Sequence, residues 1–256
     1  MRLVRFLKGG QTLWGHLDGE RIGTLTGDPL GEFARGPLKW ALNEGTLRAP
    51  FAPGAPSKIV GVINNFADRV REAGLPAPGL PAIFLKPPSS IIGPDEAIVL
   101  PPQSEHVEHG AELAVVIRKQ ARWVAPEEAL KYVLGYTAAN DVTARDLIEQ
   151  DGLWARATGF DTFCALGPCI ATGLDPADVM ITCAVNGETR QMSSTRDLLF
   201  TVEQLIAFIS SVMTLLPGDV ILTGTPGGAG RLADGDVVEV EIEGVGVLRN
   251  PVITVK

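Results

Sequence analysis

Short apolar runs separated by glycine, proline and charged residues fill most of the chain, and this pattern predicts more strands than helices. The N-terminal part holds three such runs, each followed by a glycine-containing turn segment; they cover residues 2–7, 12–19 and 21–25. Residues 1–55 are therefore predicted to form a small β domain. The segment 49–57, with three prolines and a glycine, is the predicted linker to a second domain over 56–256.

The second domain is predicted to hold further strands and a few helices. Strands are expected over 58–63, 111–117, 180–187, 218–224 and 236–244, and helices over 64–74, 125–133 and 201–215. In 236–244, Val238, Val240 and Ile242 alternate with glutamates, a pattern typical of a half-exposed strand. Strands and helices do not alternate regularly, so the expected fold class is a β-rich α+β fold.

Composition narrows the function classes. The 256 residues carry a net charge of −8, which argues against a nucleic-acid or anionic membrane surface. No apolar stretch approaches the roughly 20 residues that a membrane span needs. The cysteines Cys164, Cys169 and Cys183 show no paired spacing, so we expect free thiols and a cytoplasmic protein.

The glycine-rich segment 223–230 raises the question of nucleotide binding. It lacks the Gly-Lys-Ser/Thr ending of a phosphate loop, and no predicted helix follows it. Its glycines suit either a loop that lies close to a ligand or a tight connection.

The segment 105–117 begins with two acids and two histidines and ends as an apolar strand. Glu108, Gly110 and Glu112 alternate along it and share one strand face, so two carboxylates on that face could join Asp141 in a site for a divalent cation. The alternative is that both glutamates are solvated residues on a strand edge. His106 and His109 lie on opposite faces of the predicted strand.

Asp141 itself allows two interpretations. It could be the N-cap of a helix beginning at Val142, which the spacing alone favours. It could instead lie at the end of a buried strand and bind a hard cation through oxygen.

Two further segments contain candidate polar groups. Arg69 and Glu72 are spaced to form a surface ion pair on a short helix, which could also serve as a lid. Lys86 follows an apolar strand and could meet a carboxylate substrate, although lysines are usually exposed.

Seven segments in a fixed order resemble the fumarylacetoacetate hydrolase family. They cover 83–94, 111–117, 135–146, 160–168, 185–195, 214–228 and 244–252. The resemblance implies a mixed β-sandwich roll with a small N-terminal β unit, a homodimer, and a Mg²⁺, Mn²⁺ or Ca²⁺ ion that chelates a small carboxylate substrate. The resemblance points to 2-hydroxyhepta-2,4-diene-1,7-dioate isomerases and 5-oxopent-3-ene-1,2,5-tricarboxylate decarboxylases of aromatic compound catabolism.

The family motifs carry over onto this chain in part. Glu112 and Asp141 match two of the three metal-binding carboxylates, while Gly110 stands where the first glutamate is expected; Glu108 or His109 are candidate substitutes. Thr158 replaces the active-site lysine of the family, and Ile148 replaces a glutamine that Gln150 could stand in for.

Arg69 and Glu72 occupy the places of the general-base pair His-x-x-Glu. An arginine, with a pKa above about 12, cannot accept a proton from water. The resemblance therefore favours isomerisation or decarboxylation of a small oxo/enol dicarboxylic acid. The alternatives are an acylpyruvate or fumarylpyruvate type of C–C hydrolase, and a non-catalytic or partner-dependent member.

The implied site residues fall into two groups. The candidate catalytic residues are Arg69, Glu72 and Lys86, and the candidate substrate-binding residues are Arg145, Gln191, Thr225 and Pro226.

Overall fold

The computed structural model describes residues 1–51 and 55–255. The N-terminal unit contains β1 (Arg2–Lys8), β2 (Gln11–Asp18), β3 (Arg21–Gly27), β4 (Phe33–Ala41), the 3₁₀ helix η1 (Leu42–Glu44) and β5 (Thr46–Arg48). The three strands predicted here are confirmed, and β4 and β5 are additional. Residues 52–54 of the predicted linker lie outside the described residues.

The strands and helices of the remaining chain follow in sequence order. The strands are β6 (Ile59–Ile63), β7 (Ala82–Lys86), β8 (Ile91–Ile92), β9 (Ile98–Leu100), β10 (Val107–Glu108), β11 (Ala111–Ile117), β12 (Val133–Asp141), β13 (Thr143–Ala144), β14 (Cys164–Ala171), β15 (Met180–Val185), β16 (Glu188–Ser194), β17 (Val220–Leu222), β18 (Val237–Ile242) and β19 (Gly246–Thr254). The α-helices are α1 (Ala67–Glu72), α2 (Arg145–Asp151), α3 (Trp154–Thr158) and α4 (Val202–Val212). Further 3₁₀ helices are η2 (Pro88–Ser90), η3 (Pro126–Tyr132) and η4 (Thr195–Asp197).

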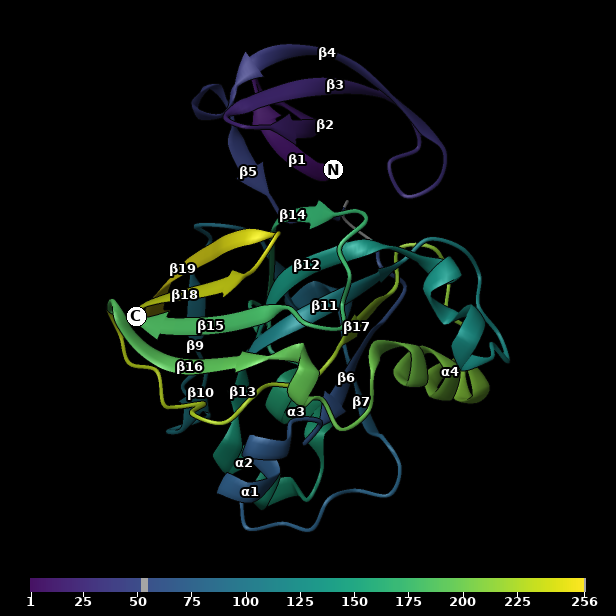
Figure 1. The fold of residues 1–256 in the computed structure, drawn as a ribbon. Coiled ribbons are helices and arrows are strands. Elements are labelled where there is room, and N and C mark those ends of the chain that lie inside the picture. The colour runs from purple at the N-terminus through teal and green to yellow at the C-terminus, as the bar shows by residue number, and fades with distance from the viewer. Residues whose placement is uncertain (52–54, 256) are drawn as a thin grey trace.

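Two sheets dominate the fold (Figure 1). The larger has twelve strands in the order β4-β3-β2-β1-β14-β12-β11-β17-β6-β7, with β5 beside β1 and β8 beside β14. The smaller has the order β16-β15-β18-β19-β9. Most neighbouring strands are antiparallel, but β8, β6 and β9 each pair in parallel with a partner, so the sheets are mixed. The expected β-rich α+β class is confirmed.

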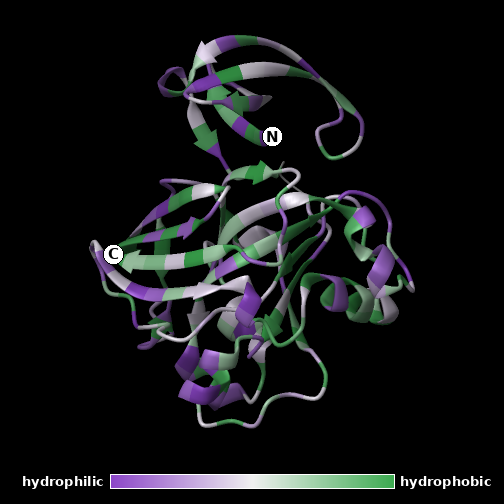
Figure 2. Cartoon of the chain, in the orientation of Figure 1, coloured by the Kyte–Doolittle hydropathy of each residue, from purple (hydrophilic) through white to green (hydrophobic). Residues whose placement is uncertain are grey.

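The core lies where β11, β12 and β14 of the larger sheet contact β15, β18 and β19 of the smaller one. β11 is buried along its whole length, which explains its uninterrupted apolar sequence after Glu112. β18 instead buries Val238, Val240 and Ile242 and turns its glutamates toward solvent, as its alternating pattern predicts. Figure 2 maps the hydropathy of each residue onto the same view of the fold.

The N-terminal unit extends the larger sheet, because β1 pairs with β14 through Arg2↔Ala171 and Leu3↔Ile170. Figure 1 shows its strands gathered at one end of the molecule. The two-domain division at residue 55 stays a prediction, since these backbone pairs run across it.

The predicted helices form with one difference in type. α1 is followed by Gly74 in the left-handed region (φ 64°), and α4 begins with a capping box between Thr201 and Gln204. The segment 125–133 forms the 3₁₀ helix η3, whose N-cap Ala125 has no side chain to bond the first N–H groups. No helix in the described part of the chain is long and apolar enough to span a membrane.

The prediction that Asp141 caps a helix at Val142 is wrong. Asp141 ends β12, and the backbone N–H of Val142 donates to Phe163 O, which keeps the chain extended. The next residues form β13, and α2 begins only at Arg145. A long-range backbone pairing thus prevents the helix start that the local pattern favours.

Candidate active site

One pocket contains most of the polar residues predicted from the sequence. It is a small pocket at the ends of β11 and β12. It is lined by Val62, Ile63, Asn64, Arg69, Phe84, Glu108, His109, Gly110, Glu112, Asp141, Thr143, Arg145, Trp154 and Thr225. Glu108, Gly110 and Glu112 therefore line one pocket, as the alternation predicts.

Glu112 lies on the pocket wall but is nearly inaccessible, with 2% exposure. Its Oε2 accepts a hydrogen bond of 2.7 Å from the backbone N–H of Gly224. Burial and the neighbouring carboxylate of Asp141 raise the pKa of Glu112 well above its usual value. The alternative of a solvated glutamate on a strand edge is wrong for this residue.

Asp141 is paired with a buried lysine. Lys86 Nζ donates to Asp141 Oδ1 at 2.6 Å and to Val142 O at 3.2 Å, and Lys86 is 1% exposed. Lys86 reaches this position because it ends β7, the edge strand beside β6. The expectation of an exposed lysine is wrong, because its partner is a carboxylate 55 residues along the chain.

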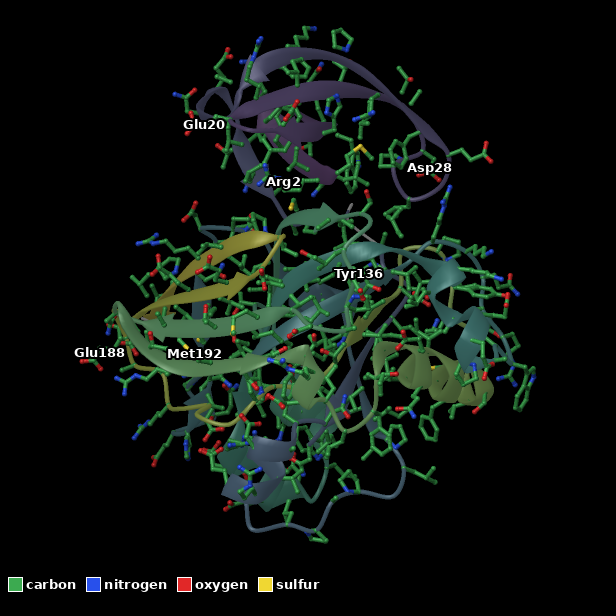
Figure 3. All side chains as sticks on the ribbon, in the orientation of Figure 1. Arg2, Glu20, Asp28, Tyr136, Glu188 and Met192 are labelled. Carbon is green, nitrogen blue, oxygen red and sulfur yellow. The ribbon has the colours of Figure 1, made fainter. Side chains whose placement is uncertain are left out.

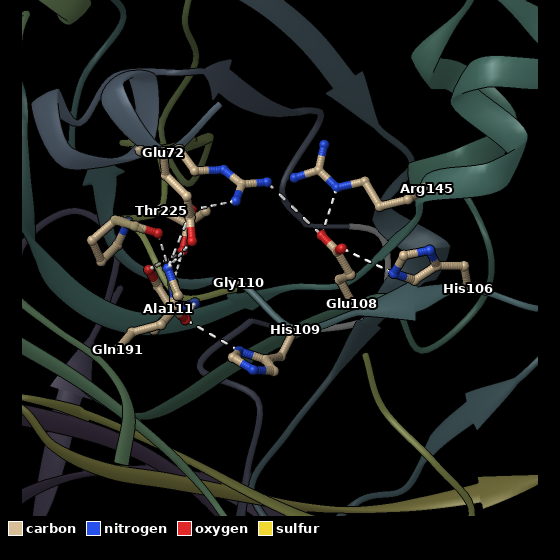
Figure 4. A network of polar contacts seen from close by, with 12 residues as sticks. Glu72, His106, Glu108, His109, Gly110, Ala111, Arg145, Gln191 and Thr225 are labelled. Atoms are coloured by element: carbon tan, nitrogen blue, oxygen red, sulfur yellow. Dashed lines mark hydrogen bonds and ion pairs between the residues drawn. The ribbon is translucent and has the colours of Figure 1, made fainter. Parts of the chain in front are cut away.

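Three cationic or potentially cationic side chains surround Glu108 (Figure 4). Arg145 Nε donates to Glu108 Oε2 at 2.8 Å, and an Arg69 guanidinium nitrogen lies 3.9 Å from the same oxygen. His106 Nε2 lies 3.1 Å from Glu108 Oε1. The predicted ion pair between Arg69 and Glu72 is also present, at 2.8 Å.

The glycine-rich segment lies beside the pocket and is held there by Gln191. The Gln191 amide donates to Thr225 Oγ1 at 2.8 Å and to Pro226 O at 2.9 Å, and its oxygen accepts from Ala111 N at 3.0 Å. Gly224 has a φ of 101°, and a Cβ there would lie 2.9 Å from Asn65 Cβ. Of the two interpretations of this segment, the loop close to a ligand site agrees with these contacts.

Gln191 comes from β16, where neighbouring residues face opposite sides of the sheet. Gln191 points inward and is buried, whereas Met192 is 65% exposed. Figure 3 shows Glu188 and Met192 along this outer strand. Because both ends of the Gln191 amide are bonded within the protein, its predicted contact with substrate stays a prediction.

The residues present fit a divalent cation that also takes ligands from outside the protein. Glu112 and Asp141 supply two carboxylates, and Gly110 supplies no side chain. Among the described residues, no three His, Cys, Asp or Glu side chains gather as a metal-binding group. Mg²⁺ is commonly held by one or two carboxylates, with waters and substrate oxygens completing its shell.

The two candidate substitutes for the missing glutamate have other contacts. Glu108 is bonded to Arg145, and His109 Nδ1 lies 3.1 Å from Gln191 Oε1 and 3.4 Å from Cys183 Sγ. Burial lowers the pKa of His109 below its usual value. A metal-binding role for either residue stays a prediction.

The other positions taken from the family pattern lie outside the pocket lining. Thr158 donates to Trp154 O at 2.9 Å, and Gln150 Oε1 accepts from Arg156 at 3.1 Å. Ile148 packs against the core.

Sequence reasoning missed the aromatic wall of the pocket. Phe84 and Trp154 stack with ring centroids 5.1 Å apart, and the Arg145 guanidinium lies 5.6 Å from the Trp154 ring. The one available signal is that Phe84 lies within the family-like segment 83–94 and Trp154 lies between the segments 135–146 and 160–168.

Two family profiles match this chain. Residues 58–253 match the fumarylacetoacetate (FAA) hydrolase C-terminal family, and residues 1–50 match the Rv2993c-like N-terminal family. The first match covers most of the chain and includes all the pocket residues described above.

Relatives of stated activity are similar over long stretches. The oxaloacetate tautomerase FAHD2A, mitochondrial, of Bos taurus is 43% identical over 223 residues, covering 82% of this chain and 70% of its own length. The structure of 5-carboxymethyl-2-hydroxymuconate delta-isomerase from Mycobacterium smegmatis is 43% identical, with a TM-score of 0.91 and full coverage of both chains. That of maleylpyruvate hydrolase from Sphingobium sp. SYK-6, in complex with manganese (II) ion and pyruvate, is 31% identical, with a TM-score of 0.82 and full coverage of both.

Proposed function

Because the chain belongs to the fumarylacetoacetate hydrolase family, we propose that it is an enzyme that isomerises or tautomerises a small oxo/enol dicarboxylic acid. The observation that carries this proposal is the charge layout of the pocket. Glu112 and Asp141 offer carboxylates to a divalent cation, and Arg69 and Arg145 offer guanidinium groups to an anion. A substrate with an oxo acid at one end and a second carboxylate at the other matches both groups.

The chain's own residues divide the work as follows. Lys86 holds Asp141 in place, and Glu112 is held by the Gly224 N–H. A bound Mg²⁺ or Mn²⁺ would polarise the substrate's oxo group and acidify the adjacent C–H. Arg145 has two guanidinium nitrogens that are not bonded to Glu108, and these bind the second carboxylate.

We assign proton transfer to Glu72, which is not among the lining residues of the pocket but pairs with the lining residue Arg69. It lies on α1, 2.8 Å from Arg69, and also accepts from the Gly228 N–H at 3.2 Å. In tautomerisation a carboxylate takes a proton from carbon and returns one to the enol oxygen, so no water has to be activated. Hydrolysis is disfavoured because the His-x-x-Glu pair that the family resemblance implies for activating water is incomplete here, with Arg69 in the place of its histidine.

The test compares three reactions of the purified protein with Mg²⁺ or Mn²⁺. Enol oxaloacetate and 5-carboxymethyl-2-hydroxymuconate, an acid of aromatic compound catabolism, are followed by loss of enol absorbance. Acylpyruvate cleavage and CO₂ release from oxaloacetate are measured in parallel. We expect enol conversion to exceed both; faster acylpyruvate cleavage would establish the hydrolase alternative, and faster CO₂ release the decarboxylase.

Arginine variants test whether the pocket binds the second carboxylate of the substrate. Arg145→Gln should raise KM for dicarboxylates about tenfold or more, since a charged hydrogen bond is worth about 1.5–3 kcal/mol. Arg156→Gln is the matched control, because Arg156 pairs with Asp151 on the surface, outside the pocket lining. We also expect a homodimer, which light scattering after size-exclusion chromatography would test.

A further inference from the structure

We propose that His109 is a positioning residue: its Nδ1–H holds the side-chain amide of Gln191, and Gln191 in turn holds the glycine-rich loop 223–230 against the pocket. The loop carries Thr225, a candidate substrate-binding residue that lines the pocket. The inference therefore rests on the proposed function for its kinetic effect, whereas the hydrogen bonds themselves can be tested without any substrate.

The orientation of the Gln191 amide is fixed by two backbone groups that each allow one role. The N–H of Ala111 can only donate, and its nitrogen lies 3.0 Å from Gln191 Oε1. The carbonyl oxygen of Pro226 can only accept, and it lies 2.9 Å from Gln191 Nε2. The oxygen of the amide therefore faces Ala111, and its NH₂ group faces the loop.

The same oxygen decides which nitrogen of the His109 ring carries the hydrogen. His109 Nδ1 lies 3.1 Å from Gln191 Oε1, which is an acceptor, so this hydrogen bond requires a hydrogen on Nδ1. Cys183 Sγ lies 3.4 Å from the same nitrogen, and its S–H could donate there only if Nδ1 had no hydrogen. The Nδ1 lone pair would then face the Gln191 oxygen in a buried site, which is unfavourable. Burial also lowers the pKa of His109, so at pH 8 the ring is neutral.

Gln191 supports the loop through both hydrogens of its NH₂ group. One is donated to Thr225 Oγ1 at 2.8 Å, and the other to Pro226 O at 2.9 Å. The Thr225 hydroxyl donates in turn to Ala111 O at 2.9 Å. The hydrogen bonds of His109, Gln191 and Thr225 therefore form one chain that ends on β11 and fixes the position of the Thr225 hydroxyl.

His109 also contacts the far end of the loop. Its backbone N–H donates to Gly230 O at 3.1 Å, and a Cβ at Gly230 would lie 3.6 Å from His109 Nε2. His109 and Gln191 are 2% and 1% exposed, so water does not readily replace a hydrogen bond that is lost between them. Removal of the Nδ1 donor should therefore loosen the loop locally.

The first experiment identifies the protonated ring nitrogens by ¹⁵N nuclear magnetic resonance at pH 8. The chain has three histidines, so the variants His109→Asn and His106→Gln assign the signals. His16 is the internal reference, because its Nε2 lies 3.0 Å from the carbonyl oxygen of Gly36 and must donate to it. We expect the hydrogen on Nδ1 in His109 and on Nε2 in His16. A hydrogen on Nε2 of His109 would overturn the inference.

The second experiment measures backbone amide exchange over the loop 223–230 by mass spectrometry. His109→Leu removes the donor, whereas His109→Asn keeps one in the place of Nδ1, since both nitrogens are bonded to Cγ. We expect exchange in the loop to rise about threefold to tenfold in His109→Leu, the effect of one hydrogen bond, and to stay within about twofold of the wild type in His109→Asn. His106→Leu is the matched control, because His106 contacts Glu108 and should leave the loop unchanged. An equal rise in both His109 variants, or a rise spread over the whole chain, would contradict the positioning role.

Kinetics connect the loop to the proposed function. His109→Leu should raise KM for the enol dicarboxylate more than it lowers kcat, and His109→Asn should restore KM. In a Thr225→Val background, His109→Leu should add little, because both changes act on the same hydrogen-bond chain. Additive effects on KM would contradict a route through Thr225. Nδ1 protonation and a local rise in exchange, in a protein that converts no enol dicarboxylate, would contradict the proposed function alone. If His109→Leu does not fold, the ring nitrogens of the wild type still decide.

Discussion

Lys86 Nζ lies 2.6 Å from Asp141 Oδ1, and both residues are buried, with Asp141 among the residues that line the pocket. Such a pair loses water contacts on both sides, and it is stable because each charge has the other as its partner. The pair fixes the orientation of Asp141 before any ligand binds.

Removing one member of this pair should be strongly destabilising. Lys86→Met leaves the Asp141 carboxylate buried without its partner, and we expect a loss of about 3–5 kcal/mol in the free energy of unfolding. The double variant Lys86→Met/Asp141→Asn should recover part of that loss. Urea denaturation measures both. Lys131→Met, which breaks an exposed pair with Glu128, is the control and should cost less than about 1 kcal/mol.

Glu108 contacts both arginines of the pocket, so under the proposed function it competes with a substrate carboxylate for them. Glu108→Gln removes the charge that Arg145 and Arg69 contact. We therefore expect KM for dicarboxylic substrates to fall about threefold or more, with a smaller change in kcat. His106→Gln is the control, because His106 contacts Glu108 but does not line the pocket. A higher KM for Glu108→Gln would mean instead that Glu108 orients the arginines for binding.

The buried His109 makes stability fall in acid. Burial holds the pKa of His109 below its ordinary value of 6.5, so the unfolded chain takes up this proton more readily than the folded one. The contribution of neutral His109 to stability is complete above pH 6.5. It is lost as the pH falls toward the lower pKa that His109 has in the folded state. The melting temperature of the wild type should therefore drop more between pH 7.5 and 5 than that of His109→Gln. An equal drop in the two proteins would rule out this origin.

Glu112 affects the pH dependence of stability with the opposite sign to His109. Its pKa is raised by burial and by Asp141, so ionisation of Glu112 disfavours the folded state. Its contribution is favourable below the ordinary pKa of about 4.5 and is lost as the pH rises through the higher folded-state pKa. In metal-free protein at pH 8, Glu112→Gln should melt at a higher temperature than the wild type. We also expect Mn²⁺ to raise the melting temperature of the wild type but not that of Glu112→Gln. Differential scanning calorimetry measures both effects.

Local patterns predicted the buried parts of the fold well. The apolar run of β11 reflects burial on both faces of the strand, and the alternation in β18 reflects one buried and one more exposed face. Each pattern therefore predicts its strand directly. β4 was missed because none of its residues is fully buried, and Arg35 and Lys39 are exposed, so burial leaves little trace in its sequence.

The polar contacts of the site could not be predicted in the same way. Lys86 and Asp141 are 55 residues apart, and Glu108 and Arg145 are 37 apart. Each side chain has an ordinary local setting, and only the folded sheet brings the partners together. The family motifs indicated candidate residues, but the pairing of Lys86 with Asp141 and of Arg145 with Glu108 required the structure.

The pairing of β1 with β14 has a consequence for the integrity of the whole sheet. Along its outer edge, β14 pairs with β8 at Cys164 and Ala165 and with β1 at Ile170 and Ala171. A chain shortened to begin at Ser57 would leave unpaired backbone groups at one end of β14, and light scattering should detect its self-association. The N-terminal unit thus covers the end of β14, a strand of the sheet that carries the pocket, which would otherwise present unpaired backbone groups.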